Sequence, residues 1–297
     1  MSGAGESPAP ASASFGDRLA SAVARRESQI VLGIDPDPSR LWPEALARTS
    51  EARAELAQSV AAAHESARAV LTAATPAPKG NGRPAATGAE PPRPPALEAA
   101  AAVLAHCLAL IEAAAPACVA AKPQLACFER LGFAGALALE AVCEAARSAG
   151  LLVLADGKRG DVPVTAAAYA QALTGRTPSP FGAVPGLEAD ALTANPLLGR
   201  DALEPIVAGA RVTGATVPEH LARMRELMPR TPFLLPGVGA QGGDVRDLAP
   251  AFAAGRAGGL VTASRSIANA HEQGAGTPAD AARAEAERLR ELAWGLA

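Results

Sequence analysis

The chain has 297 residues, of which 49% are hydrophobic and 19% charged, which is enough apolar material for one sizeable core. Its formal net charge of −3, from 27 basic and 30 acidic side chains, provides no broad positive field for nucleic acid or an anionic membrane. We therefore expect a single domain that binds neither nucleic acid nor a membrane. Any anionic ligand would be bound through a local cluster of charges.

The N-terminus and the cysteines give no sign of export. Residues 1–14 are mostly Ala, Ser, Pro and Gly, and lack the basic and apolar regions of a signal peptide. No segment approaches membrane-spanning length without proline or charge. The four cysteines lie in or beside apolar runs without a C-x-x-C pair, so we expect neither disulfides nor a metal site. These features predict a soluble, cytoplasmic protein with a disordered tail at 1–14 and one domain over 15–297.

Apolar runs alternate with helical sequence along the chain. An amphipathic helix from Phe15 leads to a buried strand over 30–35, followed by a helix over about 51–71. Residues 75–95 have no periodicity and predict a disordered surface insertion. Further strands are expected at 118–123, 151–156, 190–195, 211–216, 233–238 and 259–264, and further helices at 97–114, 133–148 and 202–208. This alternation predicts parallel βα units.

Polar and charged residues recur where these apolar strands end. An α/β barrel builds its active site at the carboxyl ends of its strands. A doubly wound open sheet shares the alternation, but its usual glycine-rich fingerprint does not follow the first strand. We therefore predict a TIM (β/α)8-type barrel.

The run from Asp156 to Asp161 is the strongest candidate for chemistry. Residues two apart in an extended chain point to one face, so Asp156 and Lys158 project together from a strand end. Asp161 and Thr165 follow at one-turn intervals and can add a carboxylate and a hydroxyl. On spacing alone, a salt bridge beside a solvated helix start remains an equal alternative. Lys122 and Asp35 also close apolar strands before prolines, which favours a functional cluster on one rim.

A phosphate site is indicated after the last two strands. Residues 236–243 form a glycine-rich turn that exposes backbone N–H groups, and Arg265 follows the final strand. Loops after the seventh and eighth strands commonly bind phosphate in such barrels. The planar guanidinium of Arg265 matches phosphate oxygens.

Taken together, these motifs resemble the orotidine 5′-phosphate decarboxylase family, specifically its bacterial subgroup with Lys-Pro-Gln and Asp-x-Lys-Arg-Gly-Asp signatures. The resemblance extends from Phe15 to about Ile267. It rests on the segments 32–36, 122–129, 154–162, 193–196, 236–243 and 264–266.

The resemblance implies a homodimeric barrel that converts orotidine 5′-phosphate to uridine 5′-phosphate and CO2, the last step of pyrimidine synthesis, with no metal or organic cofactor. Asp156 would lie against the substrate carboxylate, and Lys158 would stabilise and protonate the carbanion at C6. Asp35 and Lys122 would hold the ribose hydroxyls. The resemblance further assigns Asp161 and Thr165 to the neighbouring subunit's site, Gln241 and Arg265 to the phosphate with Gly242 and Gly243 beside them, and Asn195, Pro236 and Ser264 to the substrate-binding residues.

One departure from the family pattern follows the helix at 202–208. A strand and helix that the family has there are missing, because Gly209 and Ala210 run directly into the strand at 211–216. We therefore count seven strands and predict a gap or distorted seam in the barrel, with reduced or absent activity.

Two other functions remain open. A sugar-phosphate decarboxylase or aldolase would share the barrel, the phosphate site and the Asp156-x-Lys158 pair, but would want a magnesium site, and no extra acid stands beside Asp156. A non-catalytic homologue would bind uridine 5′-phosphate without turnover, which would suit the missing βα unit.

Overall fold

The computed structural model describes residues 14–58, 95–207, 213–214, 218–236, 245–274 and 276–296. The expected helix over 51–71 is therefore seen only up to residue 58, where 49–58 are helical. The tail before Ser14, nearly all of the insertion at 75–95, Ala210 and the glycine-rich turn after Pro236 lie outside the described residues.

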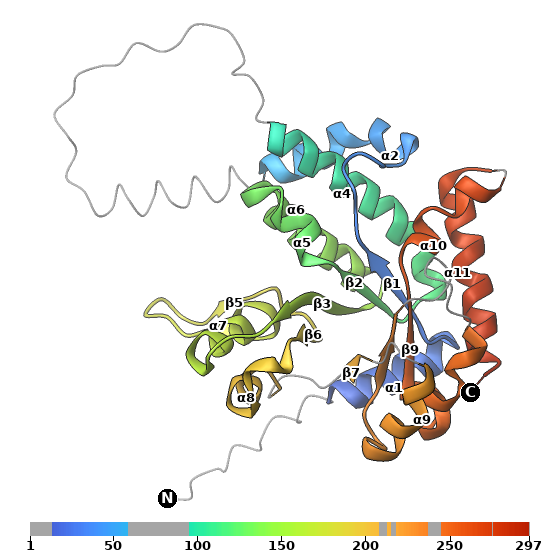
Figure 1. Cartoon of the computed structure of the whole chain (residues 1–297). Coiled ribbons are helices and arrows are strands. Elements are labelled where there is room, and N and C mark those ends of the chain that lie inside the picture. The colour runs from blue at the N-terminus through green and yellow to red at the C-terminus, as the bar shows by residue number, and fades with distance from the viewer. Residues whose placement is uncertain are drawn as a thin grey trace, which may run out of the picture.

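Seven parallel strands form one sheet in the order β6-β3-β2-β1-β9-β8-β7. The strands are β1 (Ile30–Ile34), β2 (Ala120–Pro123), β3 (Leu152–Arg159), β6 (Ala191–Ala194), β7 (Thr213–Gly214), β8 (Phe233–Leu235) and β9 (Gly259–Ala263). The first strand pairs with the last, Ile30 opposite Val261, as in a sheet that curls round into a barrel. The predicted parallel βα architecture is confirmed (Figure 1).

The sheet has two edges, β6 and β7, which are the strands on either side of the predicted missing unit. Between them the chain forms helix α8 (Arg200–Val207) and then, beyond residues 208–212, enters β7. Within the described part of the chain, no ladder joins β6 to β7. A seven-stranded barrel with a gap is what the missing βα unit predicts, because closure depends on strand number and stagger together.

Helices cover the outer face of the sheet and one of its ends. They are α1 (Phe15–Arg26), α2 (Pro43–Ala47), α4 (Pro95–Ala114), α5 (Leu125–Glu129), α6 (Gly132–Ser148), α7 (Pro163–Thr174), α9 (Pro218–Leu227), α10 (Arg265–Ala268) and α11 (Pro278–Trp294). Alternate residues of β1 divide between two cores: Ile30 and Leu32 pack with the outer helices, whereas Val31 packs inside with α1. Helix α1 thus closes the end of the barrel opposite α2 (Figure 1).

Helix α4 is apolar along most of its length. Residues Pro95–Ala117 are long and apolar enough to cross a membrane by length and composition, although they include prolines and two glutamates. Within this segment, 61% of an 18-residue apolar window is buried, and α4 packs against α6, α11 and α2. The alanine-rich composition that makes α4 apolar on all sides is that of a core helix.

A short antiparallel hairpin between α7 and β6 was not predicted. Strands β4 (Arg176–Thr177) and β5 (Val184–Pro185) pair with each other, apart from the main sheet. Two-residue strands carry no readable periodicity, and the sequence between them, residues 178–183, includes two prolines and a glycine.

Candidate active site

The centre of the candidate site is Asp156, on the bulged carboxyl end of β3. Ala155 pairs with Leu192 of β6, and the next pair is Arg159 with Ala194. Three residues of β3 therefore lie opposite the single residue Thr193. Such a β-bulge redirects side chains, and it explains why β3 continues to Arg159 rather than ending at Asp156 as predicted.

Four donors surround the Asp156 carboxylate. Lys158 Nζ and Thr193 Oγ1 donate to Oδ1 at 2.6 and 2.8 Å, and Lys122 Nζ and Gln124 Nε2 donate to Oδ2 at 2.6 and 3.3 Å. Burial raises the pKa of the Asp156 carboxyl, but the Lys122 ammonium and the hydrogen bonds from Lys122, Lys158 and Thr193 outweigh it, so the net pKa lies below the usual value. The structure thus holds Asp156 as an anion.

The two lysines beside Asp156 differ in exposure. The Lys122 side chain is 7% exposed and that of Lys158 is 66% exposed. Lys122 therefore acts as a buried counterion, whereas Lys158 can reach a ligand and exchange protons with water. Lys158 also has a φ of 45°, a left-handed conformation that is strained for a residue with a side chain and typical of functional sites.

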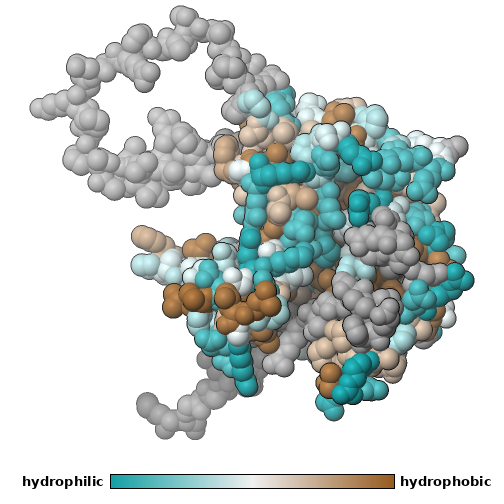
Figure 2. All heavy atoms as spheres, in the orientation of Figure 1, coloured by the Kyte–Doolittle hydropathy of each residue, from teal (hydrophilic) through white to brown (hydrophobic). Residues whose placement is uncertain are grey.

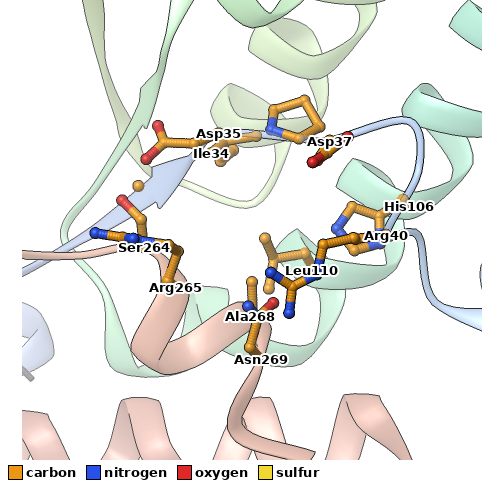
Figure 3. A pocket seen from close by; sticks show the side chains of 12 residues that line it. Ile34, Asp35, Asp37, Arg40, His106, Leu110, Ser264, Arg265, Ala268 and Asn269 are labelled. Atoms are coloured by element: carbon orange, nitrogen blue, oxygen red, sulfur yellow. The ribbon is translucent and has the colours of Figure 1, made fainter. Parts of the chain in front are cut away.

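A cavity of about 340 Å³ lies between the end of β1, helix α4 and helix α10, and the side chains around Asp156 are not among its lining residues. Figure 3 shows Asp35, Ser264 and Arg265 at one end of the cavity and Asp37, Arg40 and His106 at the other. Charged groups of both signs thus line this cavity. The predicted ribose-binding and phosphate-binding residues Asp35 and Arg265 are brought together here.

His106 lines this cavity as an uncharged imidazole. Burial and then the nearby His271 lower the pKa of His106 to about 4, and its Nδ1 accepts a hydrogen bond from the Trp42 backbone N–H at 3.2 Å. The positive charge in the cavity wall therefore comes from Arg40 and Arg265, because the imidazole is uncharged near neutral pH.

Ser264 and Gly33 fit against each other at the mouth of the barrel. A Cβ added at Gly33 would lie 1.7 Å from Ser264 Oγ, so only glycine leaves room for this serine. Ser264 is half-buried directly before α10, where it also lines the cavity.

Among the residues that the structure describes, Asp161, Thr165 and Asn195 make no hydrogen bond to the Asp156 carboxylate. Asp161 accepts the N–H of Val162 at 2.7 Å, and within the described chain neither Asp161 nor Thr165 hydrogen-bonds to Asp156 or Lys158. Asn195 is exposed, and its side chain accepts the N–H of Leu197. Pro236 is exposed after β8, and Gln241, Gly242 and Gly243 lie outside the described residues.

Sequence reasoning missed Thr193 and Gln124 as partners of Asp156. Both were within the motif segments, but no site role was given to either. Each follows the rule that identified the other residues, since Thr193 lies near the end of β6 and Gln124 directly after β2. Arg40, which lines the cavity and pairs with Glu272 at 2.5 Å, carried no signal in the sequence.

No group of three or more His, Cys, Asp or Glu side chains is arranged to hold a metal ion among the residues that the structure describes.

Comparison with known proteins identifies similar sequences. A family model described as "Orotidine 5'-phosphate decarboxylase / HUMPS family" matches residues 97–215. The orotidine 5′-phosphate decarboxylase of Deinococcus radiodurans is 39% identical over 234 residues, which cover 61% of this chain and 83% of that protein. The protein of the same name from Rhodopirellula baltica is 36% identical over 233 residues, covering 59% and 75%.

Solved structures share the fold. Leishmania donovani UMP synthase superposes with a TM-score of 0.59 at 25% identity, covering 94% of this chain and 56% of that one. Leishmania donovani OMP decarboxylase superposes with a TM-score of 0.57 at 24% identity, covering 94% and 99%. These likenesses support the barrel architecture seen in the sheet.

Proposed function

We propose, on the premise that this chain belongs to the orotidine 5′-phosphate decarboxylase family, that it is a carboxy-lyase that converts orotidine 5′-phosphate to uridine 5′-phosphate and CO2. The observation that carries the proposal is the Lys122–Asp156–Lys158 array, in which both ammonium groups lie 2.6 Å from one buried carboxylate. This reaction supplies uridine 5′-phosphate, the product of the last step of pyrimidine synthesis.

The array provides the two charges that the reaction needs. The anionic Asp156 repels the substrate carboxylate beside it, which raises the free energy of the bound substrate. This repulsion is relieved as the carboxylate leaves as CO2. The electron pair of the broken C–C bond remains on C6, where the Lys158 ammonium stabilises it and then donates a proton. The resulting neutral amine regains its proton from water, to which Lys158 is open.

The choice of lysine at Asp156 supports a proton-transfer role. The chain has only three lysines, Lys79, Lys122 and Lys158, among its 27 basic Lys and Arg residues. Two of these three meet at one carboxylate, whereas the other ion pairs in the described chain use arginine. Arginine cannot give up a proton near neutral pH and lysine can, so lysine is the side chain that this step requires.

Substrate binding is assigned to residues at the carboxyl ends of the strands, of which Asp35, Ser264 and Arg265 line the cavity. Asp35 and Lys122 would hold the ribose hydroxyls, and Arg265, with Gln241 and the turn at Gly242 and Gly243, would bind the phosphate. We place Asn195, Pro236 and Ser264 at the margin of the substrate. Binding energy from the phosphate, remote from C6, can then support the chemical step.

The Lys-Pro-Gln signature supports assignment to the bacterial subgroup named above. Gln124 and Lys122 of that signature both donate to Asp156, which belongs to the second signature. We also propose one domain over 15–297 after a tail at 1–14, and a cytoplasmic location. Four free cysteines, three of them buried, suit a reducing compartment.

Turnover of orotidine 5′-phosphate, followed as loss of substrate absorbance, tests the function. We expect decarboxylation that a chelator does not affect, at a rate below that of eight-stranded relatives, because no ladder joins β6 to β7 among the residues that the structure describes. Loss of activity with a chelator would favour the sugar-phosphate alternative. Binding of uridine 5′-phosphate in calorimetry without any turnover would favour a non-catalytic homologue.

A homodimer with shared active sites is the proposed assembly. An apolar patch follows Asp161 on the chain and extends over α7, the β4–β5 hairpin and the turn after β6. Its exposed residues are Val162, Val164, Phe181, Val184, Leu197 and Leu198. Figure 2 shows apolar side chains gathered on this side of the molecule. A concentration of exposed apolar side chains of this kind is typical of an interface, and it lies on the segment that carries Asp161 and Thr165.

A charged side chain introduced into this patch is expected to dissociate the proposed dimer. Val164 is 84% exposed, so Val164→Asp should leave the fold intact but bury a carboxylate in the interface, giving a monomer with lower activity. Sedimentation velocity measures the change, and Leu227→Asp, at an exposed leucine outside the patch, is the matched control. A wild-type chain that sediments as a monomer would contradict the dimer.

A further inference from the structure

We infer that Thr193 is a positioning residue that holds the catalytic bulge of β3 in its working conformation. The inference rests on the proposed decarboxylation and assigns a role to a side chain on the neighbouring strand. It follows from the register of β3 and β6, from the hydrogen bonds of one hydroxyl and from the backbone conformation of Lys158.

The bulge removes ladder hydrogen bonds that a regular strand would make. Asp156, Gly157 and Lys158 all lie between the pairs Ala155–Leu192 and Arg159–Ala194, and β6 has only Thr193 to face them. Backbone N–H groups that lose their ladder partners bond to another acceptor, either in the protein or in water. The Lys158 N–H donates to Thr193 Oγ1 at 2.9 Å, so a side-chain hydroxyl replaces the missing backbone carbonyl as acceptor.

The same hydroxyl also binds the catalytic carboxylate. Thr193 Oγ1 donates to Asp156 Oδ1 at 2.8 Å, and since a hydroxyl has one hydrogen, its remaining role toward Lys158 is that of acceptor. One side chain therefore joins the backbone of Lys158 to the carboxylate of Asp156. Lys158 Nζ binds that same oxygen at 2.6 Å, which closes a small ring of contacts around the reacting ammonium.

The backbone of Lys158 needs such support. Its φ of 45° is unfavourable for a residue with a Cβ and persists only where surrounding contacts hold it. Beyond the bulge the two strands rejoin, where the Asn195 N–H donates to Arg159 O at 2.7 Å. Between these fixed ends, Thr193 is the residue on β6 that contacts both members of the Asp156–Lys158 pair.

Loss of the hydroxyl would therefore misplace the ammonium rather than remove it. Asp156 would keep its contacts with Lys122 and Gln124 on Oδ2 and could turn toward them. The described residues proposed to bind the ribose and the phosphate lie on other elements: Asp35 follows β1, Lys122 is on β2 and Arg265 begins α10. Substrate binding should therefore change little. A positioning role thus predicts a fall in kcat with a nearly constant KM.

Two substitutions at Thr193 and one matched control test the inference. Thr193→Val keeps the shape without the hydroxyl and is expected to lower kcat about 10²-fold, with KM within about threefold. Thr193→Ser restores the hydroxyl and should retain kcat within about fivefold. The control is Thr262→Val, because Thr262 is a buried barrel threonine whose Oγ1 has no hydrogen-bond partner in the described part of the chain; its kcat should change by less than about twofold.

A second measurement separates this inference from the proposed function. Hydrogen exchange at the Lys158 amide, followed by NMR, should be faster in Thr193→Val than in the wild type and unchanged in Thr262→Val, whether or not the protein turns over substrate. Unchanged exchange in Thr193→Val, or a wild-type kcat in that variant, would overturn the inference. A Thr193→Ser variant as slow as Thr193→Val would also overturn it, since the hydroxyl would then not be the cause. A wild type without turnover but with the expected exchange pattern would refute the decarboxylation alone.

Discussion

Replacement of Lys158 by alanine is expected to lower kcat/KM for orotidine 5′-phosphate by at least about 10³-fold. The substitution removes both the cation that stabilises negative charge at C6 and the acid that protonates it, and each contribution is worth orders of magnitude in rate. Because the Lys158 side chain is 66% exposed, the free energy of unfolding should hardly fall. Steady-state kinetics and thermal unfolding of the same preparation measure the two effects.

Two further variants make this result specific. Lys158→Arg keeps the positive charge but not an acid that can release its proton, so it should remain close to the alanine variant in rate. Arg200→Ala removes an exposed cation, 92% accessible in its pair with Glu204, and should leave kcat/KM unchanged. If Lys158→Ala turns over at the wild-type rate, the proposed mechanism is wrong.

Replacement of Asp156 by alanine is expected to abolish activity and also to lower the free energy of unfolding by about 3–5 kcal/mol. The loss of stability arises because Lys122 would be left as a buried, uncompensated ammonium, with its side chain only 7% exposed. Urea denaturation measures the stability. The double variant Asp156→Ala/Lys122→Met should regain most of the stability, because it also removes the buried charge, but none of the activity.

The stability that Asp156 contributes should depend on pH in a defined direction. Its carboxyl has a folded-state pKa below the ordinary value of 3.8, so the unfolded chain takes up the proton first as pH falls. The contribution is therefore fully present at neutral pH and is lost as pH falls below about 4. A wild-type advantage over Asp156→Ala that persists undiminished at pH 2 would contradict the ionised state assigned to this residue.

Much of the fold was predictable because it depends on local patterns. Apolar runs of strand length alternating with helical periodicity predicted parallel βα units, and the structure places all seven predicted strands in one sheet. The missing strand and helix between the helix at 202–208 and the strand at 211–216 predicted a gap in the sheet, and β6 and β7 are its edges in the part of the chain that the structure describes. The hairpin of β4 and β5 was missed because its strands are too short for periodicity to show.

The meeting of charged residues at one rim was predictable in part. Charged residues at the ends of apolar strands were expected to meet on one rim of a parallel barrel, and the structure brings Lys122, Asp156 and Lys158 into contact there. That reasoning places residues on the rim but says nothing about which atoms touch. It could not show that Lys122 is buried against Asp156 while Lys158 is open to water.

The sequence by itself therefore determined the class of fold and the identity of the charged rim residues, since each is expressed in composition, periodicity or a motif within a short stretch of chain. The missing βα unit was expected from the family pattern that the sequence resembles. Only the tertiary structure decided that the Asp156–Lys158 run is a bulge, that Thr193 supports it and that the apolar helix α4 is buried in a core. These features depend on the register between strands and on packing between segments distant in sequence. Contacts of that kind arise only when the whole sheet is assembled, so no local pattern records them.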